Sequence, residues 1–270
     1  MGERNKYMIS LDYVDSGKGF DFGKTAEDYA KYRDIYTDSF YKTLIDFNLG
    51  TAGQNAIDLG TGSGVIPRNM IQHGAKWTGA DISAEQIEMA KILSAENNLN
   101  IDYLVCPADN VPLSDNSFDT VIACQCFWYF PIDSTSLEIK RLLKPGGKFA
   151  ILSMIGLPKE SEILSKSEEL VLKFNPNWNG CNFDRIKSQP PDWLENNYSV
   201  VALHDYVEEV TFTREGWCGR MRACRGVGAS LPLDLVEQYD KEHFAALCEI
   251  ANEKFTIPHQ YSFQIFEVIK

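Results

Sequence analysis

Residues 56–64, AIDLGTGSG, decide the fold of this chain. An apolar run ends at Asp58, and glycines then occupy positions 60, 62 and 64 before helix-like sequence resumes at Val65. Glycine permits positive φ and lets a ligand approach the backbone, while a helix N-terminus offers unpaired N–H donors. This strand, turn and helix start therefore predict a loop that holds a nucleoside-type cofactor.

The glycine spacing distinguishes two cofactor types. The dinucleotide pattern G-x-G-x-x-G needs glycine at position 65, where the chain has Val65. The pattern found, G-x-G-x-G with an acid two residues before the first glycine, resembles motif I of the class I S-adenosylmethionine (SAM) dependent methyltransferases. On this stretch alone a glycine hairpin or a phosphate loop stays open, so the downstream segments decide.

Composition sets the outer limits on function. A chain of 270 residues with 44% apolar content is long enough for one α/β domain with an extra subdomain. Its net charge of −12 disfavours nucleic acid as a partner. We expect no membrane span and a cytoplasmic location, because no stretch has the length and apolarity of a signal or a transmembrane helix. Seven cysteines without C-x-x-C spacing suggest neither a disulfide framework nor a metal site.

The predicted organisation is a flexible arm over residues 1–20 and a single methyltransferase domain over 21–270. In this domain the SAM-binding core covers about 21–155 together with the C-terminal strands, and insertions at about 156–200 and 214–255 form a lid with substrate contacts. Residues 21–48 are expected to be helical, with Tyr29, Tyr32, Tyr36 and Phe40 along one face.

Apolar runs and turn residues predict the remaining elements. Beyond the strand before the glycine loop, we expect further strands at 76–80, 101–106, 118–124, 148–154, 200–213 and 257–269. Helices are expected at 65–73, 83–98, 161–174, 214–228 and 233–255.

The segment YAKYRDIY, residues 29–36, resembles the N-terminal Y-x-x-Y-R-x-x-Y segment of small-molecule methyltransferases of the ubiquinone-biosynthesis and trans-aconitate types. The resemblance implies that Tyr32 and Arg33 close over the methionine end of SAM. Arginine suits this role, because its guanidinium makes paired hydrogen bonds to a carboxylate.

Asp81 ends the second predicted strand, about 20 residues past the glycine loop, where an acid can accept both ribose hydroxyls. The resemblance gives Asp81 this role, lets Ile82 pack on the adenine, and assigns Asp109 and the Ala108 backbone to the adenine edge. Gln125 takes the position that contacts the methionine part. The predicted cofactor contacts are therefore Tyr32, Arg33, Asp58, Gly60, Thr61, Gly62, Gly64, Asp81, Ile82, Ala108, Asp109 and Gln125.

RLLKPGGKFAILSM, residues 141–154, resembles the post-core motif of the same family, in which Pro-Gly-Gly is a structural turn. Four such segments occur in the family's order over about residues 20–154. The resemblance implies a doubly wound, seven-stranded, mostly parallel sheet of the Rossmann-like methyltransferase type, with an antiparallel edge strand and a helical lid.

The acceptor site is read from fewer signals. Trp128 is expected near the reactive sulfonium. Arg222 and Arg225, three residues apart on a predicted helix, can bind a carboxylate or phosphate of the substrate, although a solvated cationic face stays open. If the nucleophile carries a proton, then Tyr129, Tyr32 and His204 are the candidate bases.

We therefore expect SAM-dependent methyl transfer to a small molecule, which gives S-adenosylhomocysteine and needs no metal. The sequence has no N-P-P-Y or D-P-P-Y segment after the fourth strand and no Pro-Cys dipeptide, which disfavours enzymes that methylate adenine, glutamine or cytosine. Two alternatives stay open: a SAM-binding protein without transfer activity and a nicotinamide-dependent oxidoreductase. The sequence does not distinguish a monomer from a homodimer, and it does not identify the acceptor.

Overall fold

A computed structural model describes residues 8–194 and 197–270 of the chain. The chain divides into two compact units. Unit 1 contains the described residues up to Ile35 together with Ile155–Ile186 and Val207–Gln260, and unit 2 contains Tyr36–Met154, Lys187–Tyr206 and Tyr261–Lys270. The boundary falls inside three strands, so each of these strands begins in one unit and ends in the other.

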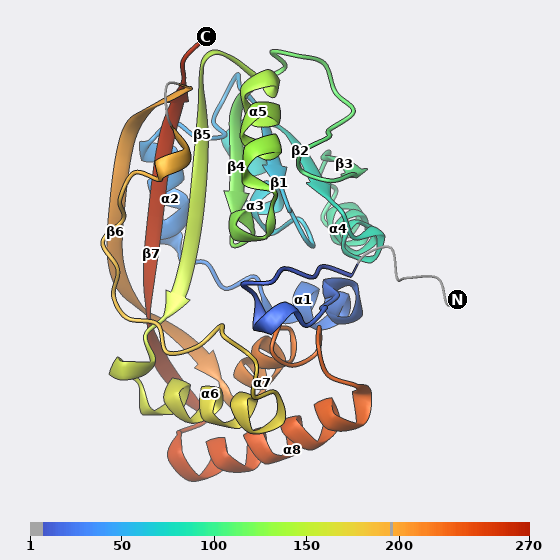
Figure 1. The fold of residues 1–270 in the computed structure, drawn as a ribbon, viewed down its shortest axis with the longest axis vertical. Coiled ribbons are helices and arrows are strands. Elements are labelled where there is room, and N and C mark those ends of the chain that lie inside the picture. The colour runs from blue at the N-terminus through green and yellow to red at the C-terminus, as the bar shows by residue number, and fades with distance from the viewer. Residues whose placement is uncertain (1–7, 195–196) are drawn as a thin grey trace. The chain divides into compact units, whose positions relative to one another are not determined.

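Seven strands form one sheet in the order β3-β2-β1-β4-β5-β7-β6. Neighbouring strands from β3 to β5 pair in parallel, and Figure 1 shows β7 running opposite to β5 and β6. The strands are β1 (Asn55–Leu59), β2 (Lys76–Asp81), β3 (Asp102–Val105), β4 (Phe118–Cys124), β5 (Leu143–Gly156), β6 (Tyr198–Thr213) and β7 (Lys254–Val268). The expected mostly parallel sheet with antiparallel pairing at one edge is confirmed.

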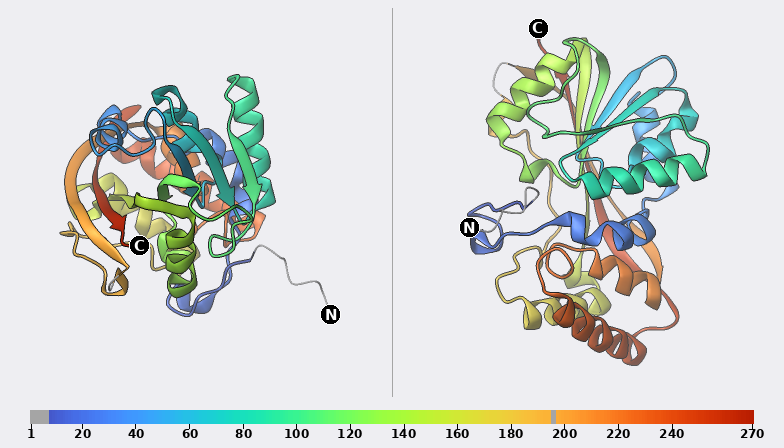
Figure 2. Two further views of the ribbon diagram at one scale, coloured as in Figure 1. Left: turned by 90° about the horizontal axis from the view of Figure 1, so that it is seen from above. Right: turned by 90° about the vertical axis from the view of Figure 1, so that its right-hand side faces the viewer.

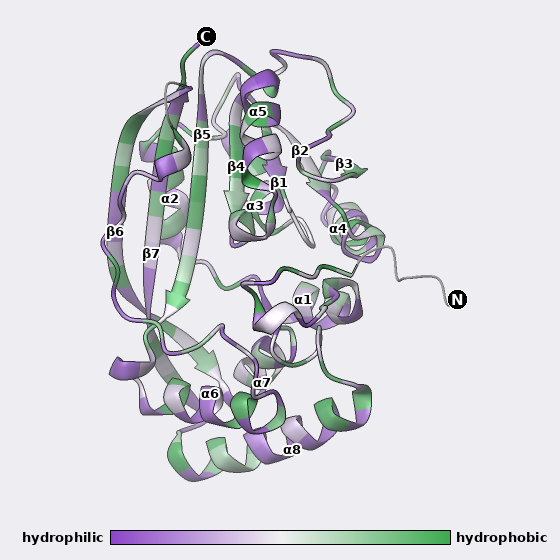
Figure 3. Ribbon diagram, in the orientation of Figure 1, coloured by the Kyte–Doolittle hydropathy of each residue, from purple (hydrophilic) through white to green (hydrophobic). Residues whose placement is uncertain are grey.

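Four helices flank the sheet of unit 2: α2 (Asp38–Asp46), α3 (Val65–Met70), α4 (Ala84–Glu96) and α5 (Ile132–Leu142). In the left view of Figure 2, α2, α3 and α4 lie on one side of the sheet and α5 on the other. Helices on both faces make this a doubly wound sheet, as expected. Both faces of a central strand are then buried, and β4 is accordingly coloured hydrophobic along most of its length in Figure 3.

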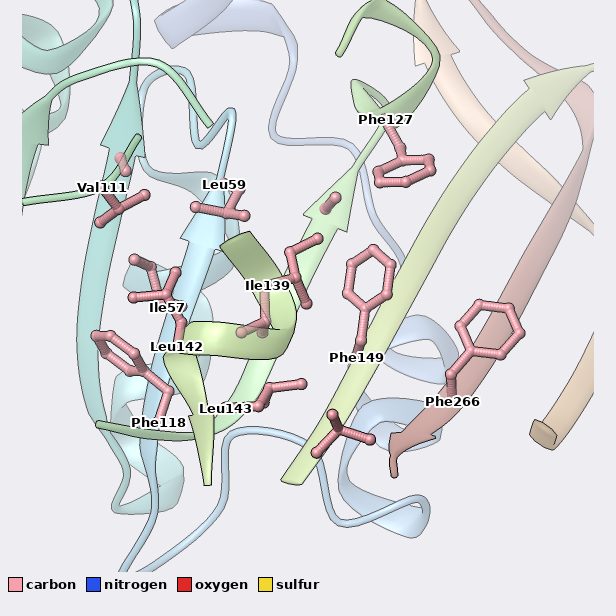
Figure 4. Packing of buried hydrophobic residues seen from close by; sticks show 14 of the residues in the cluster. Ile57, Leu59, Val111, Phe118, Phe127, Ile139, Leu142, Leu143, Phe149 and Phe266 are labelled. Atoms are coloured by element: carbon pink, nitrogen blue, oxygen red, sulfur yellow. The ribbon is translucent and has the colours of Figure 1, made fainter. Parts of the chain in front are cut away.

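The core of unit 2 lies between α5 and the sheet. Ile57 and Leu59 from β1, Val121 from β4 and Phe149 from β5 are fully buried there. Figure 4 shows Phe127 and Phe149 packed close together, with ring centroids 5.4 Å apart. Because β1 and β4 are held rigidly in this core, the loops that follow them start from fixed positions.

Unit 1 is mainly helical. Its helices are α1 (Ala26–Tyr32), α6 (Glu162–Phe174), α7 (Arg214–Arg222) and α8 (Leu233–Ile250). Helix α7 packs on both α1 and α8, and α6 also packs on α8. Side-chain oxygens cap two of these helices: Ser161 accepts from Leu164 N, and Thr213 accepts from Gly216 N.

The helix expected over 233–255 ends at Ile250, and β7 already begins at Lys254. Three further predicted elements differ from the structure. The helix expected over 21–48 is broken, because residues 33–37 separate α1 from α2, so Tyr29, Tyr32, Tyr36 and Phe40 do not share one helical face. The Thr37 and Ser39 hydroxyls bond each other at 2.8 Å, an example of short polar side chains competing with helix.

The second difference is that α7 ends at Arg222, so Arg225 lies beyond the helix. Arg222 and Arg225 therefore do not share a helical face.

The third difference concerns Pro145-Gly146-Gly147, which lies within β5 and not in a turn before it. In this strand the pairing partners of Phe118 and Thr120 are Leu143 and Lys148, so the intervening residues of β5 bulge out of the ladder. Gly146 has a φ of 74° there, which explains why glycine follows the proline.

Residues 8–20 make specific contacts within unit 1. Ile9 and Phe20 form a bridge, Phe20 is buried, and the Asp15 carboxylate lies 3.2 Å from Arg225 Nε. This described part of the predicted arm is therefore anchored, whereas residues 1–7 lie outside the described residues. For residues 1–7 the expected flexibility stays a prediction.

Two observations over the whole described chain bear on membrane spans and on metal sites. None of its helices, over 8–194 and 197–270, combines the length and apolarity that crossing a bilayer requires. Within the same ranges, no three His, Cys, Asp or Glu side chains gather as metal ligands would.

Candidate functional site

The candidate site lies where the parallel strands of unit 2 end. The register pairs Leu59 with Ala80, and Asp81 with Val105, so β1, β2 and β3 finish side by side. Loops that leave the carboxyl ends of adjacent parallel strands are brought to the same edge of a sheet, which is the usual ligand-binding edge of such folds. The structure therefore brings together the glycine loop, Asp81 and the segments that follow β3 and β4.

The glycine loop has the backbone that its sequence predicts. Gly60, Gly62 and Gly64 have φ values of 68°, 55° and 76°, in the left-handed region that favours glycine. The loop is tied to β2, since Gly60 N and Thr61 N donate to Ala80 O at 2.8 and 3.0 Å. A Cβ at Gly60 would lie 2.7 Å from Cys126 Sγ, so glycine is required there for space as well as for conformation.

Asp58 lies buried below this loop. Its Oδ2 accepts from the Thr61 hydroxyl at 2.7 Å. No hydrogen-bond donor reaches the buried Oδ1 from within the described residues. Burial, together with the charge of Asp81, raises the pKa of Asp58 to about 7, although the Thr61 hydrogen bond lowers it. The unpartnered oxygen is an acceptor available to a bound group or a water molecule.

Asp81 connects the glycine loop to helix α4. Its Oδ2 accepts from Gly62 N at 2.8 Å, and its Oδ1 accepts from Ser83 N at 2.9 Å. Burial raises the pKa of this carboxyl, and the backbone N–H donors partly offset that effect. A carboxylate has about four acceptor positions, so both oxygens can accept further hydrogen bonds. Ile82 beside it has 42% of its surface exposed, so an apolar face is available for a flat ring.

Ala108 and Asp109 follow β3, as predicted. The Ser134 hydroxyl donates to Asp109 Oδ2 at 2.8 Å, which leaves the other carboxylate oxygen for a further donor. Glu138 holds the same loop from α5, because its Oε1 accepts from Val111 N at 2.7 Å. Ala108 packs against the hydrophobic core, so its backbone is fixed.

The segment after β4 carries three predicted site residues. Gln125 has a φ of 61°, unusual for a residue with a side chain, and its Nε2 donates to Met154 O. Trp128 and Tyr129 follow in a short 3-10 turn with ring centroids 5.7 Å apart, and Trp128 is exposed. The Tyr36 hydroxyl lies 3.2 Å from Cys124 Sγ, at the end of the same strand. The positive φ of Gln125 is a form of backbone strain, and such strain is concentrated at functional sites in proteins generally.

Tyr32 and Arg33 belong to unit 1. The Tyr32 hydroxyl donates to Glu215 Oε1 at 3.0 Å, and its ring lies against Gly219 of α7. The guanidinium of Arg33 lies 5.0 Å from the centre of the Tyr29 ring. The expected contact of Tyr32 and Arg33 with the methionine end of SAM stays a prediction.

Arg222 and Arg225, also in unit 1, are engaged by acids of the chain itself. Arg222 makes two hydrogen bonds to Asp28, at 3.0 and 2.9 Å, and one to Asp240 at 2.6 Å. Arg225 pairs with the buried Asp15. A guanidinium that is already held by carboxylates is a poor anion receptor, so the structure favours a structural role for both.

His204 lies in the part of β6 that belongs to unit 2. Its ring is exposed and lies among Phe47, Tyr206 and Phe263, with centroids 5.9, 5.5 and 6.1 Å away. These neighbours are a packing environment, and none of the three is an acid that orients the imidazole as a base. Its predicted catalytic role stays a prediction.

Comparison with known proteins agrees with this geometry. Residues 57–151 match a family model described as "Methyltransferase domain". This range begins in the strand before the glycine loop and ends in β5, so it contains the glycine loop, Asp81 and the segments that follow β3 and β4. Residues 57–151 of the chain are a methyltransferase domain.

Curated relatives of this domain include ubiquinone biosynthesis O-methyltransferases. The one from Xanthomonas euvesicatoria is 28% identical over 156 residues, which are 56% of this chain and 65% of that protein. The one from Stutzerimonas stutzeri is 28% identical over 134 residues, 49% of this chain and 58% of that protein. This chain thus spans less than two thirds of the length of either relative.

Solved structures share the fold. The YcgJ protein from Bacillus subtilis superimposes with a TM-score of 0.53 at 16% identity, covering 87% of this chain and all of that one. The MccD protein gives a TM-score of 0.52 at 15% identity, with 86% and 97% covered. At such low identity the agreement concerns the methyltransferase fold and not the acceptor.

The residues of unit 2 fit SAM on the observations above. Three left-handed glycines leave the loop backbone bare, Asp58 has an unpartnered buried oxygen, and Asp81 has acceptor capacity left. These groups suit the hydroxyl and ammonium donors of a nucleoside linked to an amino acid. Reasoning from sequence missed Glu138 and Cys126, which support this site, because neither belongs to a motif.

Proposed function

We propose that this protein transfers the methyl group of SAM to a small-molecule acceptor and releases S-adenosylhomocysteine. The observation that carries the proposal is the position of Asp81, at the end of β2 and bonded to Gly62 of the glycine loop. A carboxylate there is suited to hold a ribose, with Ile82 beside the adenine and Asp109 at its amino group. The small-molecule acceptor is inferred from the ubiquinone biosynthesis O-methyltransferases among the relatives and from the net charge of −12.

When bound, SAM supplies a methyl group on a positively charged sulfur, which an O, N, S or C nucleophile attacks in line. The residues of the chain then have to orient the reactants and exclude water, and such positioning accounts for much of the rate in reactions of this kind. Gln125 and Trp128 are suited to this task, since both follow the end of β4. An acceptor hydroxyl or amine also loses a proton, for which Tyr129 is the candidate base at this edge of the sheet.

The first experiment is titration calorimetry of the protein with SAM, S-adenosylhomocysteine and NADH in parallel. We expect micromolar binding of the two sulfur compounds and none of NADH. Binding of NADH alone would refute the proposal and favour an oxidoreductase. SAM binding without turnover to S-adenosylhomocysteine across hydroxylated, amino and thiol acceptors would instead indicate a protein that only binds SAM.

The ribose assignment is tested with Asp81→Asn, which keeps the size of the side chain and removes its charge. We expect SAM affinity to fall by about tenfold or more, because charge-assisted hydrogen bonds to the ribose are weakened. Asp102→Asn on the neighbouring strand β3 is the matched control, since Asp102 is exposed. If both variants bind SAM as tightly as the wild type does, then Asp81 does not contact the ribose.

A further inference from the structure

Strand β2 contains a glycine at a position that strands disfavour. Gly79 lies in the interior of β2, where glycine weakens a strand, since it has no side chain to pack and loses the most backbone entropy on folding. Its backbone is not in the left-handed region, so conformation does not explain the glycine. A glycine of this kind often marks the close approach of another group.

The group that approaches Gly79 is the ring of Tyr103 in β3. The sheet register pairs these two residues. A Cβ at Gly79 would lie 2.7 Å from Tyr103 Cε1 and 2.8 Å from Cδ1, so the ring occupies the space that a side chain would need. The same Cβ would lie 2.9 Å from Cγ2 of Thr61. The Tyr103 ring and a side chain of the glycine loop therefore cover the same residue of β2.

The far end of this ring reaches the glycine loop itself. A Cβ at Gly64 would overlap Tyr103 Oη and would lie 3.0 Å from Cζ. Gly64 is the last residue of the loop before α3, and its φ of 76° places it in the left-handed region. One tyrosine ring thus fills the space beside two glycines, Gly79 in β2 and Gly64 in the loop.

The hydroxyl of Tyr103 is held by α4. It lies 3.0 Å from the hydroxyl of Ser94, which is buried on that helix. Burial raises the pKa of the Tyr103 phenol, against the lowering effects of Ser94 and Arg68, so this hydroxyl is neutral at physiological pH. The ring is therefore fixed at both ends, by its own backbone in β3 and by Ser94 in α4.

We propose that Tyr103 is a positioning residue of the cofactor site, and that its ring holds Gly64 so that the glycine loop has its binding conformation before SAM arrives. This inference rests on the proposed methyltransferase function and adds a residue that is not among the expected cofactor contacts. All of the groups involved lie in unit 2. A loop that is already ordered loses less conformational entropy when its ligand binds, so the ring increases SAM affinity through the loop.

The experiment compares the wild type with Tyr103→Phe, which keeps the ring, and with Tyr103→Leu and Tyr103→Val, which remove it. Because β3 is an edge strand and Tyr103 is only partly buried, we expect all three variants to fold. Calorimetry measures the affinity for S-adenosylhomocysteine. Nitrogen-15 NMR of glycine-labelled protein without cofactor follows the backbone amides of Gly62 and Gly64.

The matched control is Phe266→Leu. Phe266 is fully buried in β7, and β4 and β5 lie between β7 and β1 in the sheet. This substitution should therefore lower the unfolding temperature, as Tyr103→Val does, without changing the glycine loop.

We expect Tyr103→Leu and Tyr103→Val to weaken S-adenosylhomocysteine binding by about tenfold, and to shift and broaden the Gly64 signal. Tyr103→Phe should bind within about twofold of the wild type, because the ring still lies beside Gly64. Phe266→Leu should bind as the wild type does. When an acceptor is known, loss of the ring should raise the KM for SAM and leave kcat unchanged.

Three results would overturn the inference. One is a folded Tyr103→Leu or Tyr103→Val variant that binds as tightly as the wild type. Another is an equal loss of affinity in Tyr103→Phe, which would assign the effect to the hydrogen bond with Ser94. The third is an equal loss in Phe266→Leu, which would attribute the effect to general destabilisation. Failure of the proposed function looks different, because the wild type would then bind neither SAM nor S-adenosylhomocysteine, while the Gly64 signal would still report the effect of Tyr103.

Discussion

At the scale of single residues, the buried carboxyl of Asp58 makes stability depend on pH. In the unfolded chain this group ionises near its ordinary pKa of about 3.9, whereas in the folded protein its pKa is raised to about 7. Between these values the folded state holds a proton that the unfolded state has lost. The free energy of unfolding therefore falls as the pH rises through this window and levels off above pH 7.

Asp58→Asn imitates the protonated form and should remove this dependence. We expect the variant to be more stable than the wild type at pH 8, by about 1–3 kcal/mol, and similar to it at pH 4.5. Urea unfolding at the two pH values measures the difference. A stability gap that is the same at both pH values would show that Asp58 is ionised in the folded protein.

At the scale of elements, substitutions in the glycine loop distinguish two reasons for its glycines: lack of room for a Cβ and a left-handed backbone conformation. Gly60→Ala places a Cβ 2.7 Å from Cys126 Sγ and at a φ of 68°, so it combines a clash with strain. We expect a loss of about 2–4 kcal/mol in stability together with weaker SAM binding. Gly53→Ala is the control, because its φ is 82° but no atom lies within 4 Å of the added Cβ.

For Gly53→Ala we expect a loss of only about 1 kcal/mol and unchanged SAM affinity. Thermal unfolding and calorimetry measure the two effects. Similar losses of stability in Gly53→Ala and Gly60→Ala would mean that Cys126 moves aside at no cost, and that backbone conformation alone explains the glycine at position 60.

Helix α7 supplies a case in which packing reverses a helix propensity. Glycine inside a helix is normally less stable than alanine by up to about 1 kcal/mol. A Cβ at Gly219, however, would overlap the Tyr32 ring of α1. We expect Gly219→Ala to destabilise the protein by about 1–3 kcal/mol, as overpacking does.

Gly216→Ala in the same helix is the comparison, because the nearest atom to its Cβ would be Thr213 Oγ1 at 3.1 Å. This variant should be nearly neutral in a urea unfolding experiment. If Gly219→Ala stabilised the protein as much as propensity predicts, then the Tyr32 ring would not be fixed on α7.

The sequence predicted elements well where a single local signal decides. The expected strand at 118–124 coincides with β4, and helix α6 begins directly after its capping residue, Ser161. The predictions failed where tertiary contacts or short polar residues compete with periodicity, as at residues 33–37 and after Arg222. Apolar spacing continues through both breaks, so it could not reveal them.

Among the functional residues, too, some contacts could be predicted from the sequence and others could not. The glycine loop and Asp81 were predictable, because a close backbone approach and a strand-end acid leave a pattern along the chain. The ion pairs of Arg222 were not, since Asp28 lies 194 residues away in sequence.

At the scale of the whole molecule, three strands join the two compact units. Because β5, β6 and β7 each belong partly to both, we expect the units to unfold together. Phe149→Ala in the core of unit 2 should cost about 3–5 kcal/mol. Hydrogen exchange followed by mass spectrometry should then show lower protection in α6 and α8 as well as in α4.

Leu137→Ala is the control for this prediction, since Leu137 lies on α5 with 61% of its surface exposed. It should leave exchange unchanged throughout. Reduced protection in α4 alone, with α6 and α8 unaffected by Phe149→Ala, would show instead that unit 1 is stable on its own.

Synthesis on the ribosome proceeds from the N-terminus, so β5 and β6 emerge before β7, the strand that lies between them in the sheet. Until residues 254–268 have left the exit tunnel, the 16-residue β6 has no neighbour to pair with. An unpaired strand of this length is prone to aggregate, so we expect the nascent chain to bind chaperones that shield such strands. Refolding from denaturant does not include this interval, because all seven strands are available from the start.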